Sequence, residues 1–208
     1  MIEGIVLPES VKSIFYVLNR NGYEAYIVGG AVRNSILELP VHDWDICTNA
    51  LPEDVCKLFR SKGFHVVETG LQHGTVTVMV NYRGYEITTY RTDGKYTDSR
   101  HPDSVAFVGN IREDLARRDF TMNAIAYNDD DGFIDPFNGL KDIENKVIRC
   151  VGTPVDRFTE DPLRIMRAVR FAAQLGFHIE NYTNIAMVQT NDGLSKISAE
   201  RIQSELCK

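Results

Sequence analysis

The sequence predicts an α+β protein in which a mixed part of about 150 residues precedes an all-helical tail. Two observations support this prediction. Up to residue 151, short runs rich in β-branched and aromatic residues alternate with stretches whose apolar residues recur at helical spacing. Beyond residue 151, only the helical spacing recurs. With 208 residues, the chain has room for one large or two small domains with a buried core.

The individual elements follow from turn residues and periodicity. The first helix begins after Pro8 and ends before Asn21-Gly22, a sequence typical of a helix end. A hairpin turn is expected between residues 80 and 85, and residues 91–104 have the polar composition of a surface loop. In chain order, helices are expected at 9–20, 31–39, 52–62, 111–116 and 120–127, and strands at 23–28, 43–47, 64–68, 75–80, 85–90 and 147–151.

Composition excludes several classes of protein. The chain is 43% hydrophobic and 25% charged, which is typical of a globular protein and not of a disordered or collagen-like one. Its apolar runs are far shorter than the roughly 20 residues of a membrane helix, and the first residues do not resemble a secretory signal. Four widely spaced cysteines indicate reduced thiols, so we expect a cytoplasmic protein with no membrane partner.

The net charge of −6 argues against nucleic-acid binding through overall positive charge. The stretch from Arg149 to Arg170 is an exception, because its arginines outnumber its carboxylates. Any contact with RNA is therefore expected on a local basic surface.

The most informative motif is Asp43-Trp44-Asp45. On a strand, the two carboxylates would share one face while Trp44 points to the other. Two such charges repel unless they are solvated or neutralised by cations, and oxygen-rich sites of this kind bind Mg²⁺ with substrate phosphates completing the shell. A solvated turn is the alternative interpretation.

Thirteen residues before Asp43, Gly29-Gly30 separates a predicted strand from a predicted helix. Glycines let the backbone approach a phosphate closely, the helix start favours an anion, and Arg33 adds a fork of donors. A tight strand-to-helix turn is the alternative. Together with Asp43 and Asp45, the motif suggests a triphosphate bound with Mg²⁺.

Two-metal phosphoryl transfer usually needs a further carboxylate. Glu86 is the best candidate, provided that its strand pairs beside the strand of Asp43. Its alternative interpretation is an ordinary surface glutamate.

Two later motifs carry nucleotide-binding chemistry. Arg118, Asp119 and Asn123 can hold the hydroxyl pair of a ribose, although Asp119 is also a plausible helix cap. Asp161 and Arg164 lie three apart, so that an acceptor and a donor can read the Watson–Crick edge that C and A share. Arg167 and Arg170 follow on the same side and can meet phosphates; a cap ion pair with a solvated arginine stripe is the alternative.

In this order, the motifs resemble those of the class II tRNA nucleotidyltransferase and bacterial poly(A) polymerase family, most closely its bacterial CCA-adding enzymes. The resemblance extends over nearly the whole chain. It rests on the segments 26–33, 42–45, 90–96, 117–123, 135–139, 160–164 and 199–202.

The resemblance implies a polymerase-β-like nucleotidyltransferase head with a mixed β-sheet and flanking helices in residues 1–146. An all-helical neck would follow in residues 147–208, without the C-terminal tRNA-binding part of the family. Residues 91–104 would be the flexible element associated with A addition. The implied catalytic residues are Asp43, Asp45 and Glu86, of which Asp43 and Asp45 bind Mg²⁺; the nucleotide-binding residues are Gly29, Gly30, Arg33, Arg118, Asp119, Asn123, Asp161, Arg164, Arg167 and Arg170.

The implied activity is template-independent addition of C and A from CTP and ATP to the 3′ end of tRNA. Alternatives are poly(A) addition by the same chemistry, and a nucleotide- or RNA-binding fragment with little activity. A metal phosphohydrolase is disfavoured. Such a site needs further histidine and aspartate ligands on helices, whereas His65, His73, His101 and His178 lie in segments expected to be strand, loop or turn. One departure from the family pattern is Asn34, where the motif usually continues Arg-Asp; we expect a local structural effect.

Overall fold

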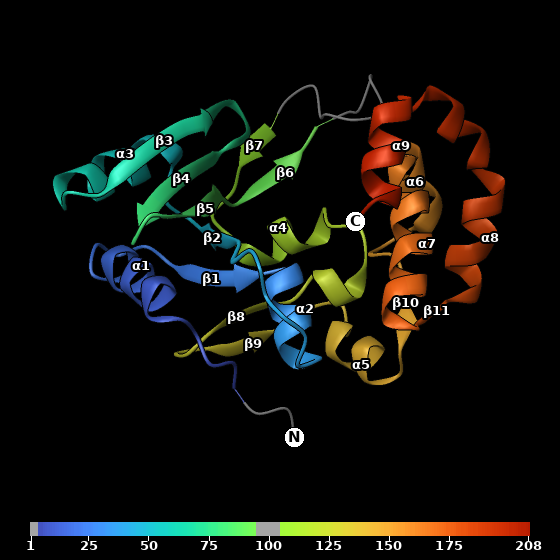
Figure 1. Ribbon diagram of the computed structural model, residues 1–208, viewed down its shortest axis with the longest axis horizontal. Coiled ribbons are helices and arrows are strands. Elements are labelled where there is room, and N and C mark those ends of the chain that lie inside the picture. Colours follow the sequence, from blue (N-terminus) through green and yellow to red (C-terminus); the bar gives the residue numbers. More distant parts are fainter. Residues whose placement is uncertain (1–3, 95–104) are drawn as a thin grey trace. The chain divides into compact units, whose positions relative to one another are not determined.

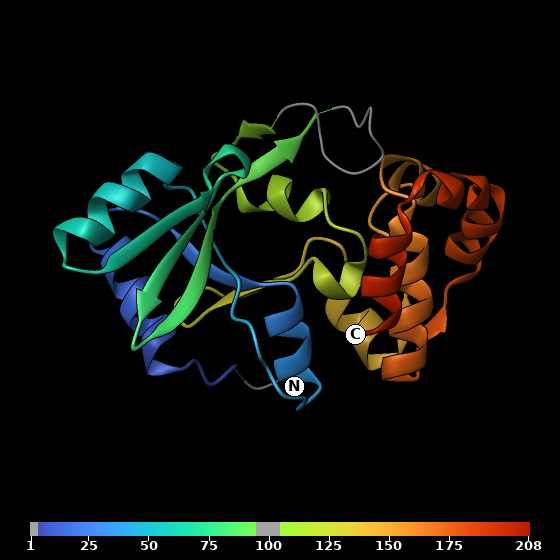
Figure 2. The ribbon, with the colours of Figure 1, turned by 45° about the horizontal axis from the view of Figure 1, so that its top comes forward.

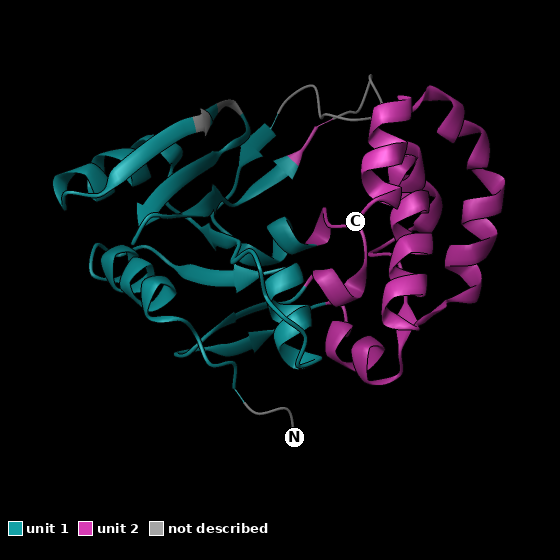
Figure 3. Ribbon diagram, in the orientation of Figure 1, with its two compact units in different colours: residues 1–92, 105–115, 125–136 teal, residues 93–104, 116–124, 137–208 magenta. Residues whose placement is uncertain are grey.

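The structure is a computed structural model that describes residues 4–94 and 105–208 (Figure 1). The chain forms two compact units (Figure 3). The predicted division at residue 147 stays a prediction. Unit 1 consists of Met1–Thr92, Val105–Leu115 and Ile125–Pro136, and unit 2 of Asp93–Ser104, Ala116–Ala124 and Phe137–Lys208.

Unit 1 is built on a mixed sheet that, within the described residues, has seven strands in the order β3-β4-β5-β2-β1-β8-β9. The pairs are antiparallel except β2–β5, which is parallel and aligns Ile46 with Ile87. A separate two-stranded sheet pairs β6 (Arg91–Asp93) with β7 (Val105–Phe107). The strands of the large sheet are β1 (Ala25–Val28), β2 (Ile46–Thr48), β3 (His65–Gly70), β4 (Thr75–Val80), β5 (Arg83–Thr89), β8 (Ala126–Asn128) and β9 (Gly132–Ile134).

The helices of unit 1 cover this sheet with their apolar sides. Helix α1 (Glu9–Asn19) buries its predicted apolar face, including Ile14 and Leu18, and packs against β1 together with α2 (Gly30–Ile36). Helix α3 (Pro52–Ser61) packs against β3, β4 and β5. The unit also holds most of α4 (Ile111–Ala116) and the 3₁₀ turn Leu71–His73.

The predicted hairpin is confirmed, with a tighter turn than expected. Strands β4 and β5, the long green arrows in Figure 2, are joined by Asn81 and Tyr82 alone. Their φ angles of 51° and 62° are the left-handed values of a two-residue turn that matches strand twist. The turn fixes the register that places Glu86 opposite Thr77.

Unit 2 is mainly helical. Helix α6 packs against α7 and α8, and α7 packs against α9. Strand β10 (Val147–Ile148) is a shorter form of the strand predicted at 147–151. It pairs in parallel with β11 (His178–Ile179), a strand that the sequence did not indicate in the tail that was expected to be all-helical. The helices are α5 (Gly139–Glu144), α6 (Pro154–Glu160), α7 (Leu163–Leu175), α8 (Asn181–Gln189) and α9 (Ala199–Leu206), with 3₁₀ turns at Thr121–Asn123 and Asn191–Lys196.

Two predicted elements are wrong. The helix predicted at 120–127 is instead a 3₁₀ turn followed by β8. All eight residues of this segment are buried, so their apolar character does not mark one face of a helix. The strand at 43–47 begins only at Ile46. Most of the predicted loop at 91–104 lies outside the described residues, while Arg91–Asp93 form β6.

In the part of the chain that the structure describes, the helices are all too short or too polar to span a membrane.

Candidate active site

The predicted acidic residues of unit 1 line one cavity of about 360 Å³. Asp43 and Asp45 come from the segment before β2, and Glu86 comes from β5. All three are exposed at its surface. The cavity lining consists of Asp43, Trp44, Asp45, Thr77, Gly84 and Glu86.

The sheet register explains why these carboxylates meet. Because β2 and β5 run parallel with Ile46 beside Ile87, the residues just before this pair, Asp45 and Glu86, are brought close together. The Asp45 carbonyl also accepts a hydrogen bond of 3.1 Å from the Val28 N–H. Glu86 therefore lies beside the aspartates through the predicted pairing of neighbouring strands. The predicted alternation of faces is wrong, because Asp43 and Asp45 precede the strand and Trp44 lines the same cavity.

Negative charge is concentrated in this cavity. Partial loss of water raises the pKa of Glu86, and the charges of Asp45 and Asp43 raise it further. A carboxyl crowded by two others favours its protonated form unless a cation compensates the charge. The cavity is thus a place where bound positive charge stabilises the structure.

The donor set fits a hard divalent cation. Carboxylate oxygens are the ligands that Mg²⁺ prefers, usually one or two from protein with phosphates and water completing the shell. Within residues 4–94 and 105–208, no three His, Cys, Asp or Glu side chains are grouped closely enough to hold one metal ion. Asp43 and Asp45 therefore suit an ion that a substrate helps to hold.

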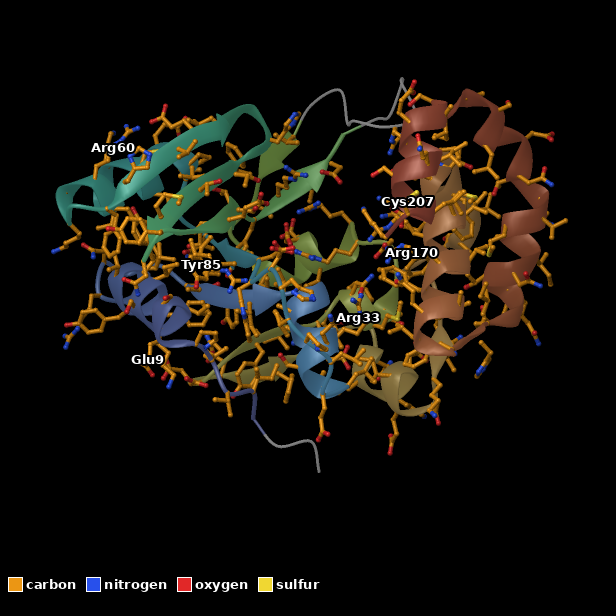
Figure 4. The ribbon with its side chains drawn as sticks, in the orientation of Figure 1. Glu9, Arg33, Arg60, Tyr85, Arg170 and Cys207 are labelled. Carbon is orange, nitrogen blue, oxygen red and sulfur yellow. The ribbon has the colours of Figure 1, made fainter. Side chains whose placement is uncertain are left out.

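The glycine motif forms the predicted turn between β1 and α2. Gly29 has φ 66° and ψ −124°, a conformation nearly restricted to glycine, and its carbonyl accepts the Arg33 N–H at 3.0 Å. Arg33, labelled in Figure 4, extends from α2. Its Nε and Nη2 donate to Oδ1 of Asn34 at 3.1 and 2.8 Å. The turn and the guanidinium therefore lie together in unit 1.

In unit 2, Asp119 and Asn123 lie side by side and are joined by a hydrogen bond. Asn123 Nδ2 donates to Asp119 Oδ1 at 3.0 Å, and the Phe120 N–H donates to the same oxygen at 2.8 Å. Asp119 Oδ2 accepts from Arg167 Nε at 2.8 Å. Burial favours the neutral acid, but the charge of Arg167, the Asn123 amide and the charge of Arg164 outweigh burial and lower the pKa of Asp119 to about 2. These neighbours therefore favour the ionised form of the Asp119 carboxyl.

Asp161 and Arg164 lie at the junction of α6 and α7 but do not pair with each other through their side chains. Arg164 Nη1 donates to Glu160 Oε2 at 2.8 Å, and its Nη2 donates to the Arg117 carbonyl at 3.3 Å. Asp161 Oδ1 accepts the Leu163 N–H at 3.1 Å, and its Oδ2 lies 3.1 Å from Arg201 Nη2. Each group is held in place by a separate partner.

The alternative interpretation of Arg167 and Arg170 as a solvated stripe is wrong, because both side chains have partners within the protein. Arg170, labelled in Figure 4, donates from Nε to Glu205 Oε1 at 2.6 Å and stacks on Phe171. Arg167 pairs with Asp119. Arg170 is engaged because α9 packs against α7 and brings Glu205 to it. Sequence reasoning missed Glu205 as the partner of Arg170 and Arg201 as the partner of Asp161; the four-residue spacing of Arg201 and Glu205 on an amphipathic helix was the available signal.

The segment 135–139 contributes to a second cavity, of about 570 Å³, in unit 2. Phe137 and Asn138 line it together with Arg149. Arg149 Nε lies 3.1 Å from Asp142 Oδ2, and its Nη1 lies 3.5 Å from Glu180 Oε1. Its charge is therefore compensated within the protein.

The strand register of the mixed sheet gathers three carboxylates at one cavity, and a glycine turn follows the neighbouring strand β1. This arrangement defines a nucleotidyltransferase-type head. Comparison with known proteins agrees: a model described as the poly(A) polymerase head domain matches residues 25–149. The chain belongs to this family.

Relatives of known name extend the comparison. The chain is 52% identical over 191 residues to the CCA-adding enzyme of Lactobacillus delbrueckii subsp. bulgaricus, covering 92% of this chain and 47% of that protein. It is 54% identical over 187 residues to the CCA-adding enzyme of Leuconostoc citreum, covering 90% and 45%. The chain thus spans about half the length of the curated relatives it matches.

Solved structures agree with the fold. The crystal structure of the Bacillus stearothermophilus CCA-adding enzyme in complex with CTP matches with a TM-score of 0.85 and 44% identity, over 96% of this chain and 48% of that chain. A tRNA nucleotidyltransferase complexed with a primer tRNA and an incoming ATP analog matches with a TM-score of 0.73 and 34% identity, over 93% and 54%.

Proposed function

We propose that this chain carries out the nucleotidyl transfer of CCA addition, adding C and A from CTP and ATP to the 3′ end of tRNA. The convergence of Asp43, Asp45 and Glu86 on one cavity is the observation that carries the proposal. The names of the relatives support it, as do the CTP and the primer tRNA in the structures that the chain resembles.

In the proposed reaction, a bond forms between the 3′-oxygen of the tRNA and the α-phosphorus of the nucleotide. The bond from the α-phosphorus to the bridging oxygen breaks, and pyrophosphate leaves. Asp43 and Asp45 would hold Mg²⁺, with Glu86 as the third acidic residue. Such an ion, when bound, neutralises phosphate charge and makes the attacking hydroxyl more acidic.

The remaining residues of unit 1 bind the triphosphate in this proposal. The backbone at Gly29 and Gly30 approaches the phosphates, and Arg33 supplies positive charge. The buried guanidinium of Arg33 is already oriented by Asn34, so less freedom is lost when phosphate binds.

In unit 2, Arg118, Asp119 and Asn123 are proposed to handle the ribose. Asp119 and Asn123 act as one rigid group because of the hydrogen bond between them. Arg167 fixes Asp119 from the other side, and Arg170 fixes Arg167 indirectly, through Glu205. We propose that these two arginines complete the nucleotide site through this network.

Base selection is assigned to Asp161 and Arg164. A carboxylate accepts from the exocyclic amine of C or A, and a guanidinium donates to the adjacent ring nitrogen. U and G present a carbonyl beside an N–H, so both contacts would be lost. The partners of Arg164, Glu160 and the Arg117 carbonyl, hold the donor in a fixed orientation, which is what discrimination between bases requires.

Poly(A) addition is the second candidate, favoured by the description of the matching family model. Both activities would use the same unit 1 chemistry. For either, we propose a cytoplasmic location, with residues 1–146 as catalytic head and residues 147–208 as neck. The reduced, buried thiols of Cys47, Cys56 and Cys150 support that location.

The test is incorporation of labelled CTP and ATP into a tRNA lacking its terminal CCA. CCA addition predicts a product that is extended by three nucleotides and then stops, with Mg²⁺ required. Long A tracts on oligo(A) would favour poly(A) addition. Absence of incorporation, with CTP binding intact, would identify a nucleotide-binding fragment.

A further inference from the structure

We propose that Asn34 is a positioning residue for Arg33, and that its uncharged amide holds the guanidinium without cancelling its charge. The inference rests on the proposed function, in which Arg33 contacts the triphosphate. Asn34 itself need not touch the nucleotide.

The side chain of Asn34 forms hydrogen bonds both to the Arg33 guanidinium and to the Pro40 carbonyl. Its Oδ1 accepts two hydrogen bonds from Arg33, at 3.1 Å from Nε and 2.8 Å from Nη2. Its Nδ2 donates to the Pro40 carbonyl at 3.0 Å. The Asn34 carbonyl accepts the Leu39 N–H at 2.8 Å. One residue therefore connects the guanidinium to the segment that leads towards Asp43.

The neutrality of this acceptor has an electrostatic consequence. An aspartate at the same position would form an ion pair with Arg33 and offset its positive charge. An asparagine fixes the same two N–H groups and adds no negative charge of its own beside the guanidinium. The gain matters because Arg33 is buried, where charges are screened less than in water.

The side-chain NH₂ group of Asn34 is a second difference from an aspartate, because it donates a hydrogen bond. A carboxylate has no proton to donate to the Pro40 carbonyl at neutral pH. The substitution Asn34→Asp would thus keep the contact to Arg33 and lose the contact to Pro40. The two residue types are not equivalent at this position, although their shapes are nearly the same.

The experiment measures equilibrium binding of CTP and of cytidine to the purified chain with Mg²⁺. We expect Asn34→Ala to weaken CTP binding by about 5- to 10-fold and to leave cytidine binding unchanged, since only CTP carries the phosphates. Asn34→Asp should also weaken CTP binding, and the difference from wild type should shrink as salt is raised. Ser35→Ala, on the same helix, is the matched control and should bind CTP as wild type does.

A double-mutant cycle separates positioning from general damage. If Asn34 acts through Arg33, adding Asn34→Ala to Arg33→Ala should cost less than about 2-fold more in CTP binding. Melting temperatures of the variants should stay near that of wild type. Full additivity of the two changes, or an Asn34→Ala variant that binds CTP normally while Arg33→Ala does not, would overturn the role of Asn34 and leave the proposed function intact. Normal CTP binding by Arg33→Ala would instead overturn the triphosphate assignment itself, and this inference with it.

Discussion

Arg167 and Asp119 form an ion pair in which Arg167 Nη2 lies 2.7 Å from Asp119 Oδ2. The pair joins α7 to the segment that precedes the 3₁₀ turn Thr121–Asn123, and the Asp119 side chain is 8% exposed. Because the carboxylate also accepts from Asn123 and Phe120, its ionised form is strongly preferred in the folded chain. The stability of unit 2 should therefore depend on pH in the acid range.

The first prediction concerns this acid dependence. The pKa of Asp119 is lowered from 3.8 to about 2 on folding, so its ionisation stabilises the folded chain above pH 4 and this contribution is lost as pH falls towards 2. Between pH 5 and pH 2, wild type should lose about 2 kcal/mol more unfolding free energy than Asp119→Asn. Urea unfolding followed by far-ultraviolet circular dichroism at each pH measures the difference, and parallel pH profiles would contradict it.

The second prediction concerns the turn before α2. Gly29→Ala places a Cβ on a residue with φ 66° and ψ −124°, which should cost about 1–3 kcal/mol of stability and weaken CTP binding. Gly109→Ala is the matched control, because a Cβ there meets no atom within 4 Å and φ is not in the left-handed region. Urea unfolding followed by the single tryptophan, Trp44, measures unit 1. Equal stability of the two variants would show that the turn tolerates a side chain.

Local patterns predict elements well where a single face is buried. Helix α1 was predicted closely because Val11, Ile14 and Leu18 mark one face, and the β4–β5 hairpin because its turn residues break an alternating pattern. The failure at 120–127 has the opposite cause. Met122 lies in the 3₁₀ turn, Ile125 directly precedes β8, and both are completely buried. Their apolar side chains therefore show neither the helical nor the strand periodicity by which an element is recognised.

The residues of the candidate site were predicted one by one, while the strand pairing that brings them together entered only as a condition for Glu86. Asp45 and Glu86 meet only because β2 pairs in parallel with β5, and no local pattern specifies which strands become neighbours. The partners of the unit 2 arginines illustrate the same limit. Glu205 reaches Arg170 across 35 residues of sequence through the packing of α9 on α7, which is a tertiary event.

The third prediction concerns the crowded carboxylates. Since the pKa of Glu86 is raised in the folded chain, its ionisation opposes folding, and stability is lost as pH rises through that pKa. Without metal at pH 7, Glu86→Gln should therefore melt about 1–3 °C higher than wild type, and the difference should vanish at pH 4. Mg²⁺ should raise the melting temperature of wild type more than that of the variant. Glu53→Gln, at an exposed glutamate of α3, is the control. A lower melting temperature for Glu86→Gln at pH 7 without metal would contradict this account.

The fourth prediction removes a proposed metal ligand. Asp43→Ala should lower incorporation of CTP into tRNA by about 10²–10³-fold or more, because the charge that develops at the phosphate loses its compensation. The melting temperature should stay near that of wild type, since Asp43 is exposed. Removal of Mg²⁺ with a chelator should have the same effect on wild type. Glu53→Ala should retain full activity, and an Asp43→Ala variant that still extends tRNA would rule out the metal assignment.

The fifth prediction concerns the choice of base. Arg164 is held by Glu160 and by two backbone carbonyls, those of Arg157 and Arg117, so its guanidinium presents donors in one orientation. Arg164→Ala should lower kcat/KM for CTP and ATP by about 10- to 100-fold and leave UTP and GTP nearly unchanged, because only C and A use the lost donor. The ratio of CTP to UTP incorporation into tRNA lacking CCA is the measurement. Arg112→Ala, at an exposed arginine of α4, should keep the wild-type ratio. If the ratio in Arg164→Ala equals that of wild type, the base is selected by other residues, and the fixed orientation of Arg164 serves only the packing of α6 against α7.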